Sequence, residues 1–386
     1  MSGSGTTSMI IAGDIGGTNT NLALVSNTEK GLQVLISLRF STREESSLVR
    51  PIESLLFAAQ RKGIGQRPDI CCISGAGPVQ GREIHLTNAP WNISASDLEE
   101  HFGLPVILIN DFSAVSYAIP LLNPDDPRQI LKIPHSDGSI PPIPPEGLAL
   151  VVGAGTGLGV GFLVKQKNGR CLAYPSEGGH SELGCWDELS YAYHRWLSEK
   201  LSYAPGAELA ASGQGIASIF SFLCSPEFDT ALAEPYFLPQ PLRPGEESSI
   251  DTAILALPEA DRPAEIATAI DRSPRCCLTM ELFARYYAAK VSGLASIFLP
   301  SGGVYLAGGI SSKHEAFLLD GQRFMRNFEK NYSPHMRKYL ARLPEMLVRD
   351  YSISLLGAAN AAVQLGGAAD AKNTRRTARR HENIGR

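Results

Sequence analysis

Two glycine-rich segments combine residue types that bind phosphate groups. The first is Gly13-Asp14-Ile15-Gly16-Gly17-Thr18-Asn19, which stands between two apolar runs, residues 9–12 and 22–25. This order predicts a strand, a tight turn and a second strand, with backbone N–H groups exposed at the turn. Glycine lets the backbone approach a ligand closely, and clustered N–H donors bind anions. Because the Asp14 carboxylate can hold a hydrated Mg²⁺ beside phosphates, the segment predicts a nucleotide site with its metal.

A second segment of the same kind strengthens this interpretation. Gly153-Ala154-Gly155-Thr156-Gly157-Leu158-Gly159 also lies between apolar stretches, residues 148–152 and 160–164. One such segment is most often only the turn of a hairpin, whereas two in one chain favour a phosphotransferase that uses a nucleotide. A third glycine pair, Gly308-Gly309, follows a strand expected at 303–307. Alone it is a weak signal, but it suits a backbone segment that approaches the nucleoside.

Asp111 is the best candidate for a general base. It follows an apolar strand expected at 105–109, with Asn110 between them. Ligands of α/β sheets bind at the carboxyl ends of strands, and phosphoryl transfer requires a base directed at the attacking hydroxyl. The alternative is that Asp111 only caps the helix expected at 114–118.

Other polar residues have the side chains needed to hold a polyol. Carboxylates accept hydrogen bonds from neighbouring hydroxyls, while Asn and His donate or accept them. Glu177 and His180 flank a Gly-Gly turn, which has two alternative interpretations, a plain exposed turn or half of a metal site. The lack of a following cysteine cluster disfavours the metal site. The whole candidate set is Thr87, Asn88, Asn110, Glu177, His180 and Glu208.

The elements expected around these residues repeat in order. Three strands, a helix at 47–61, a strand at 69–74 and a short helix precede residue 111, and a similar order recurs loosely after residue 148. This pattern predicts an α/β fold of duplicated βββαβα domains around a central cleft. We expect a small lobe at 1–110, joined by a C-terminal helix at 354–366, and a large lobe at 111–353. The proline-rich stretch 123–147 predicts a surface loop, and 369–386 a disordered basic tail.

Composition excludes several classes of protein. The 386 residues exceed what one hydrophobic core usually serves, and the 44% hydrophobic and 19% charged fractions are typical of a soluble globular protein. The net charge of −4 gives no reason to expect a nucleic-acid partner, and no apolar run is long enough to span a membrane. Seven cysteines without C-x-x-C spacing predict neither a disulfide framework nor a zinc site, so we expect a cytoplasmic protein.

Taken together, these motifs resemble the bacterial-type glucokinases of the hexokinase, actin and heat-shock-protein ATPase superfamily. The resemblance extends from Gly13 to about Gly366, and several separated motifs stand in the order of the family. It implies the two-lobed actin-like ATPase fold, which is related to ribonuclease H. The matching segments are 13–19, 86–88 with Trp91, 110–112, 153–159, 177–180, 207–208, 212–213 and 306–310.

The resemblance also implies an activity and a role for each residue. It implies transfer of the terminal phosphoryl group of ATP to the 6-hydroxyl of glucose, the first step of glycolysis, with Mg²⁺ and in a homodimer. Asp111 would be the base, with the sugar held by Asn110, Glu177, His180 and Glu208 and bordered by Thr87 and Asn88. The metal and terminal phosphates would lie at Asp14, Gly16, Gly17, Thr18 and Asn19. Gly155, Thr156 and Gly157 would form the second phosphate loop, and Gly308 and Gly309 the adenosine side.

Alternatives stay open at this point. The related ROK group of sugar kinases and repressors carries a cysteine-rich zinc motif soon after the Gly-His pair, whereas only Cys185 follows His180 closely here. That difference disfavours the ROK group. A kinase for another hexose, a kinase that uses ADP or polyphosphate, a non-catalytic sugar sensor and a sugar-independent ATPase are the remaining alternatives.

Overall fold

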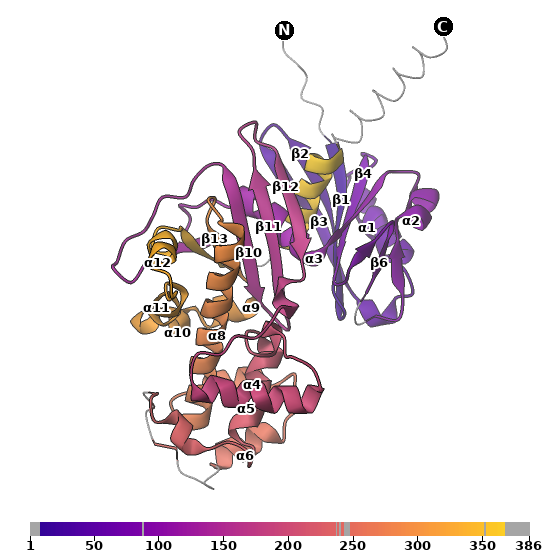
Figure 1. The fold of residues 1–386 in the computed structure, drawn as a ribbon. Helices are drawn as coiled ribbons and strands as arrows, with labels where there is room; N and C mark the ends of the chain where they lie inside the picture. The colour runs from indigo at the N-terminus through magenta and orange to yellow at the C-terminus, as the bar shows by residue number, and fades with distance from the viewer. Residues whose placement is uncertain are drawn as a thin grey trace, which may run out of the picture. The chain divides into compact units, whose positions relative to one another are not determined.

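The computed structural model describes residues 8–86, 89–236, 238, 241–242, 248–350 and 353–366. Its contacts divide the chain into two compact units (Figure 1). The first comprises Met1–Asn123, Phe162–Pro175 and Asp350–Arg386, and the second comprises Pro124–Gly161 and Ser176–Arg349. The lobe boundary expected at residue 110 stays a prediction, and the basic tail expected at 369–386 lies outside the described residues.

A five-stranded sheet forms the centre of the first unit. Its order is β3 (Gly31–Ser41), β2 (Asn19–Thr28), β1 (Ser8–Ile15), β4 (Ile70–Gly75) and β8 (Val106–Asn110). β1, β2 and β3 are antiparallel neighbours, whereas β1, β4 and β8 run parallel. The carboxyl ends of β1, β4 and β8 therefore lie at one edge of the sheet, which is where ligands bind in sheets of this kind.

Helices bury the apolar residues of this sheet. α1 (Val49–Arg61) turns Ile52, Leu55 and Ala59 inward at helical spacing, and all three are buried. The other elements of the unit are the 3₁₀ turns η1 (Thr42–Glu44) and η2 (Ile119–Leu121), a small sheet of β5 (Val79–Gln80), β6 (Glu83–His85) and β7 (Asn92–Ser94), α2 (Ala95–Phe102), α3 (Asp111–Ala118) and a helix over 353–366. The helices expected at 47–61 and 354–366 are confirmed.

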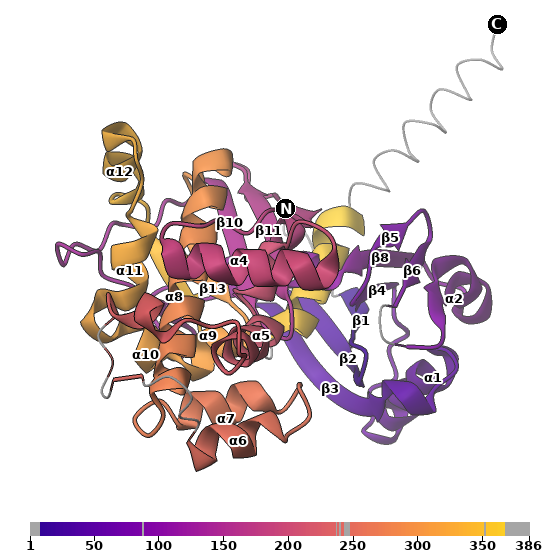
Figure 2. The same cartoon turned by 60° about the horizontal axis from the view of Figure 1, so that its bottom comes forward.

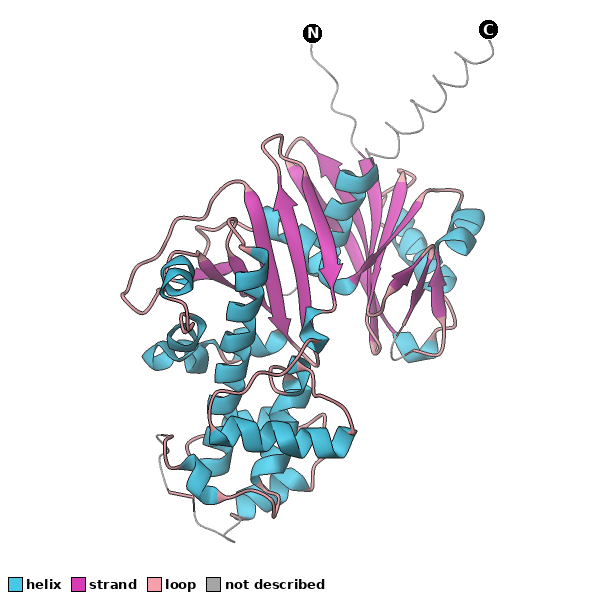
Figure 3. Ribbon diagram, in the orientation of Figure 1, coloured by secondary structure: helices cyan, strands magenta, loops and turns pink. Residues whose placement is uncertain are grey.

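A six-stranded sheet repeats the arrangement of the first (Figure 3). Its order is β12 (Cys171–Ser176), β11 (Leu158–Lys165), β10 (Gly147–Ala154), β13 (Val304–Ala307), β14 (Glu345–Val348) and β9 (Ile130–Lys132). If the strands of this sheet are numbered along the chain from β10, their spatial order is 3-2-1-4-5. The strands of the first sheet, numbered in the same way from β1, have the same order. This shared order confirms the predicted duplication. β9 is an addition at the edge.

Outside its strands the second unit is helical, and several aromatic rings form part of its core. Tyr193, Phe220, Phe283, Tyr287 and Phe324 are fully buried. α8 (Pro274–Phe298) packs against β10, α5 (Gly213–Leu223) and α11 (Arg323–Phe328), while α6 (Ser249–Leu255) and α7 (Arg262–Thr268) lie beside α5 (Figure 2). The remaining elements are η3 (Gly178–His180), α4 (Glu188–Leu201), η4 (Ala207–Leu209), η5 (Thr230–Ala233), α9 (Gly309–Lys313), α10 (Glu315–Leu319), η6 (Asp320–Gln322) and α12 (Pro334–Leu340).

The prediction of a surface loop over 123–147 was wrong in part. Residues 130–132 form β9, which pairs antiparallel with β14. Ile133 and His135 are buried directly after it, and the His135 ring bonds to Glu329 (2.8 Å) and to the Leu343 carbonyl (2.7 Å). Three residues are too few for a recognisable strand pattern, so only the pairing with β14 makes this segment a strand.

Candidate active site

In the first unit, Asp14 lies beside the ends of two other parallel strands. It is paired in register with Ser74 of β4, and Asn110 of β8 is paired with the next residue, Gly75. The hydroxyls of Ser74 (3.3 Å) and Ser354 (2.7 Å) donate to its two carboxylate oxygens. Burial raises the pKa of the Asp14 carboxyl, and the two hydroxyl bonds lower it in part.

These oxygens suit a magnesium ion. Carboxylate and hydroxyl oxygens are ligands that Mg²⁺ prefers, and this ion commonly keeps water and takes only one or two carboxylates from a protein. In the described part of the chain, no group of three or more His, Cys, Asp or Glu side chains could hold a metal ion. Asp14 therefore fits a hydrated ion that bound phosphates also hold, and not a metal site built of protein ligands alone.

The first glycine turn is a tight turn, fixed by hydrogen bonds within it and from Thr42. Gly16 N–H bonds to the Asn19 carbonyl (2.9 Å), and the Thr42 hydroxyl donates to the Gly16 carbonyl (2.8 Å). The Trp91 indole N–H in turn donates to the Thr42 carbonyl (3.0 Å). The Asn19 side chain accepts a hydrogen bond from Arg39 (3.0 Å), and Thr18 is exposed. The turn thus has a fixed shape, while residues 16–19 keep some exposure for a ligand.

Asn110 and Asp111 begin α3. The Asn110 side-chain oxygen accepts from Phe112 N–H (2.8 Å) and Ser113 N–H (3.3 Å), so Asn110 is the residue that caps the helix. Asp111 is the first helical residue, and its Oδ1 also accepts from Phe112 N–H (2.9 Å). A helix N-terminus interacts favourably with a negatively charged side chain at this position. The capping alternative therefore describes Asn110 better than Asp111.

The predicted sugar residues Thr87 and Asn88 lie outside the described residues. The chain that precedes them packs closely on the loop after β4, because a side chain at Gly77 would come within 2.0 Å of the His85 carbonyl. The Asn110 amide also donates weakly to the Gly77 carbonyl (3.5 Å). Gly77 had no role in the sequence analysis, and the close approach of the His85 carbonyl explains why the position requires glycine.

In the second unit, the second glycine turn contacts the predicted sugar ligand Glu208. Gly155 N–H bonds to the Gly157 carbonyl (2.9 Å), which closes the turn between β10 and β11. Leu158 N–H donates to Glu208 Oε2 (2.8 Å), and a Cβ at Gly157 would lie 2.4 Å from that same oxygen. The carboxylate therefore occupies the space that a side chain at position 157 would need.

The turn that carries Glu177 and His180 packs on the same hairpin. A Cβ at Gly179 would lie 2.0 Å from the Leu158 carbonyl oxygen. Glu177 and His180 are both exposed, with 3.6 Å between Glu177 Oε2 and His180 Nε2. Ala207 N–H bonds to the Ser181 carbonyl (2.8 Å), which joins this turn to η4 and Glu208. Three predicted sugar residues of this unit thus lie on connected backbone.

Gly308, in the third glycine segment, packs against Ala154 in the second. β10 and β13 are parallel, with Gly153 paired with Ala307, so Gly308 follows at the same sheet edge as Ala154. Gly308 has a φ of 92°, and a Cβ there would lie 2.2 Å from the Ala154 carbonyl. Both constraints select glycine. Gly213 N–H at the start of α5 bonds to the Gly155 carbonyl (2.8 Å), which brings a helix N-terminus to the turn as well.

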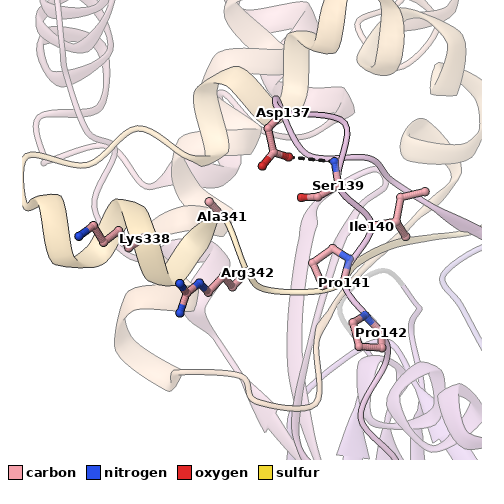
Figure 4. A pocket seen from close by; sticks show the side chains of 8 residues that line it. All are labelled: Asp137, Ser139, Ile140, Pro141, Pro142, Lys338, Ala341 and Arg342. Atoms are coloured by element: carbon pink, nitrogen blue, oxygen red, sulfur yellow. Dashed lines mark hydrogen bonds between the residues drawn. The ribbon is translucent and has the colours of Figure 1, made fainter.

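A cavity of about 520 Å³ lies elsewhere in the second unit (Figure 4). It is formed by Asp137 and the proline-rich segment after it on one side, and by Lys338 and Arg342 on the other. None of the predicted site residues lines it. The candidate site is therefore defined by the glycine turns and strand ends and not by this cavity.

The two sheets thus share one strand order, and each has a glycine turn after its first strand in that order. The first adds a metal-compatible carboxylate and an aspartate at a helix start, and the second adds carboxylate and imidazole groups suited to hydroxyls. These features define a two-lobed α/β sugar kinase. The chain belongs to the Glucokinase family, whose sequence profile matches residues 11–365.

Known relatives agree with this assignment. A glucokinase from a Nostoc species is 33% identical over 361 residues, which cover 92% of this chain and 99% of the relative. The crystal structure of a glucokinase from an Antarctic psychrotroph is 25% identical, with a TM-score of 0.71 over 91% of this chain and 98% of that one. A ROK-family glucokinase from Streptomyces griseus, solved in complex with glucose and AMPPNP, shares the fold at 20% identity, with a TM-score of 0.55 over 92% and 99% of the two chains.

Among the helices in the described ranges, none combines the length and apolar character required to cross a membrane.

Proposed function

We propose that this protein is an ATP-dependent glucokinase with Asp111 as the general base. Asp111 takes the proton of the glucose 6-hydroxyl, the hydroxyl oxygen bonds to the terminal phosphorus of ATP, and the bond from that phosphorus to ADP breaks. The observation that carries the proposal is the position of Asp111. It directly follows β8, at the sheet edge where Asp14 lies near the end of β1 and the first glycine turn follows that strand. Family membership and the glucokinase relatives support the reaction.

The other residues bind and orient the two substrates in this proposal. Asn110, Glu177, His180 and Glu208 hold the sugar hydroxyls, with Thr87 and Asn88 at its border. The turns at residues 16–19 and 155–157 hold phosphates, and Gly308-Gly309 lies by the adenosine. Asp14 holds Mg²⁺ through water, and the bound ion would neutralise phosphate charge. The two hydroxyls that donate to the Asp14 carboxylate oxygens support this role.

The compartment and the assembly are part of the proposal. None of the seven cysteines, all of which lie in the described ranges, forms a disulfide, which supports a reducing compartment such as the cytoplasm. We expect a homodimer, as the family resemblance implies, with no nucleic-acid partner. Light scattering during gel filtration checks this, and a mass equal to the chain mass of 41.5 kDa in place of twice that value would refute the dimer.

The proposal is tested by phosphoryl transfer with purified protein, ATP and Mg²⁺ across glucose, mannose, fructose and glucosamine. We expect Asp111→Asn and Asp111→Ala to lower kcat on the order of 10²–10⁴-fold, because a positioned base is lost. Glucose binding, measured by calorimetry, should persist. Asp97→Asn is the matched control, since Asp97 is an exposed aspartate in the first turn of α2 and should leave kcat unchanged.

Two results would overturn the proposal. Turnover near the wild-type level in Asp111→Asn would remove Asp111 from the role of base. No transfer to any hexose by folded wild-type protein would favour another donor, tested with ADP and polyphosphate, or a sugar sensor without activity.

A further inference from the structure

Leu158 is held at both its amide hydrogen and its carbonyl by segments that carry predicted sugar residues. Its N–H donates to Glu208 Oε2 (2.8 Å). Its carbonyl oxygen lies against Gly179, so closely that a Cβ there would be 2.0 Å away. Leu158 is the residue directly after the turn Gly155–Gly157, and the turn cannot change shape freely while both contacts hold.

Glu208 is fixed on its other side by the chain that leads into α5. Its carbonyl accepts from the Ser212 hydroxyl (2.7 Å), and Ser212 caps α5 through Gly215 N–H (3.1 Å). Gly213 N–H at the start of that helix bonds back to the Gly155 carbonyl (2.8 Å). Glu208, the start of α5 and the second glycine turn thus form one closed set of hydrogen bonds.

We infer that Glu208 is a positioning residue that makes nucleotide affinity depend on the sugar. The inference rests on the proposed function, in which Glu208 binds sugar hydroxyls and Gly155–Gly157 binds phosphate. Oε2 holds the Leu158 N–H, and Oε1 accepts from the sugar. Glucose bound at Oε1 fixes the carboxylate, the carboxylate fixes the turn, and the nucleotide then meets a turn that is already ordered.

The sign of this effect follows from the ordering of the turn. A first ligand that orders a segment spares the second ligand the entropy of ordering it, which gives positive cooperativity without any change of fold. The two affinities must change by the same factor, because coupling between binding equilibria is reciprocal. Couplings of this kind typically change affinity by about 5–150-fold.

The test is calorimetric titration with AMPPNP and Mg²⁺, with and without saturating glucose. We expect glucose to tighten AMPPNP binding to the wild-type protein at least about fivefold. In Glu208→Gln the ratio of the two dissociation constants should fall toward one, while AMPPNP alone binds within about threefold of wild type. In Gly157→Ala the ratio should also fall toward one although the carboxylate is intact, because the new Cβ takes the place of Oε2.

Glu177→Gln is the matched control. Glu177 is also a predicted sugar carboxylate of this unit, but it is exposed, and its Oε2 lies 3.6 Å from His180 Nε2. We expect this variant to bind glucose more weakly yet to keep the wild-type ratio once glucose is saturating. Thermal melts of all variants check that the fold is retained.

The outcomes separate this inference from the proposed function. The coupling is refuted if glucose does not change the AMPPNP dissociation constant of the wild-type protein. It is also refuted if both Glu208→Gln and Gly157→Ala keep the same ratio of dissociation constants as the wild type. Neither result affects glucose phosphorylation. If the ratio of dissociation constants falls toward one in Glu177→Gln as well, the cause is weaker sugar binding in general, and the coupling through Glu208 is refuted. If the wild-type protein binds no glucose, the proposed function itself fails.

Discussion

Glu345 is a carboxylate with an unusual setting. It lies in β14, is only 2% exposed, and neither of its carboxylate oxygens has a hydrogen-bond partner among the described residues. Burial is the main cause that raises its pKa well above the ordinary value, and the nearby Glu329 carboxylate raises it further. Glu345 is therefore a buried acid that is most stable in its neutral form.

We predict that Glu345→Gln stabilises the protein at neutral pH. The unfolded chain releases the Glu345 proton near pH 4.3. The folded chain keeps this proton until the pH reaches the raised pKa of the buried carboxyl. The stability from this group is fully present below about pH 4.3 and is lost as the pH rises to the folded pKa. Each pH unit in that window lowers the free energy of unfolding by about 1.4 kcal/mol. The neutral amide of glutamine does not titrate and so avoids this loss.

Chemical denaturation between pH 4 and pH 8 checks this prediction. The difference in unfolding free energy between variant and wild type should grow with pH and then level off. Glu29→Gln is the control, because Glu29 is exposed and should leave the pH dependence unchanged. A constant difference across the range would contradict a raised pKa at Glu345.

At the scale of elements, the turn η3 depends on the absence of a side chain at Gly179. We predict that Gly179→Ala costs on the order of 1–3 kcal/mol of stability, because its Cβ would overlap the Leu158 carbonyl and force the backbone apart. The displaced turn carries Glu177 and His180, so the KM for glucose should rise as well.

Gly184→Ala separates the steric effect from the substitution itself. Gly184 stands four residues after His180, and no atom lies within 4 Å of a Cβ built there. Melting temperature and KM should stay near the wild-type values in this variant. Equal behaviour of the two variants would refute the packing of η3 on the hairpin as the cause.

The elements also show what a sequence can and cannot reveal. α1 and the short helix before residue 111, now α2, were predictable because helical apolar spacing and cap residues are local signals. Of the two candidate caps of α2, Ser94 and Ser96, Ser94 accepts from Asp97 N–H. The glycine turns were predictable for the same reason. The second hydroxyl on Asp14 comes from Ser354, 340 residues away, and the contact of Glu208 with Leu158 spans 50 residues. Such partners depend on the tertiary fold, and no local pattern indicates them.

At the scale of the molecule, each unit has its own hydrophobic core. The core of the first unit includes Leu55, and the core of the second includes Leu282. Both leucines are fully buried, so truncation to alanine should cost about 2–5 kcal/mol in either case. Chains with more than one core commonly depart from two-state unfolding, because each core can open by itself.

We therefore predict that Leu55→Ala and Leu282→Ala weaken different parts of the chain. Native-state hydrogen exchange followed by mass spectrometry measures this peptide by peptide. Leu55→Ala should speed exchange of buried amides in the first unit by about 30-fold or more, the equivalent of 2 kcal/mol, with little change in the second. Leu282→Ala should show the reverse. If either variant speeds exchange equally in both units, the chain opens as one cooperative body, and the two cores are not independent sources of stability.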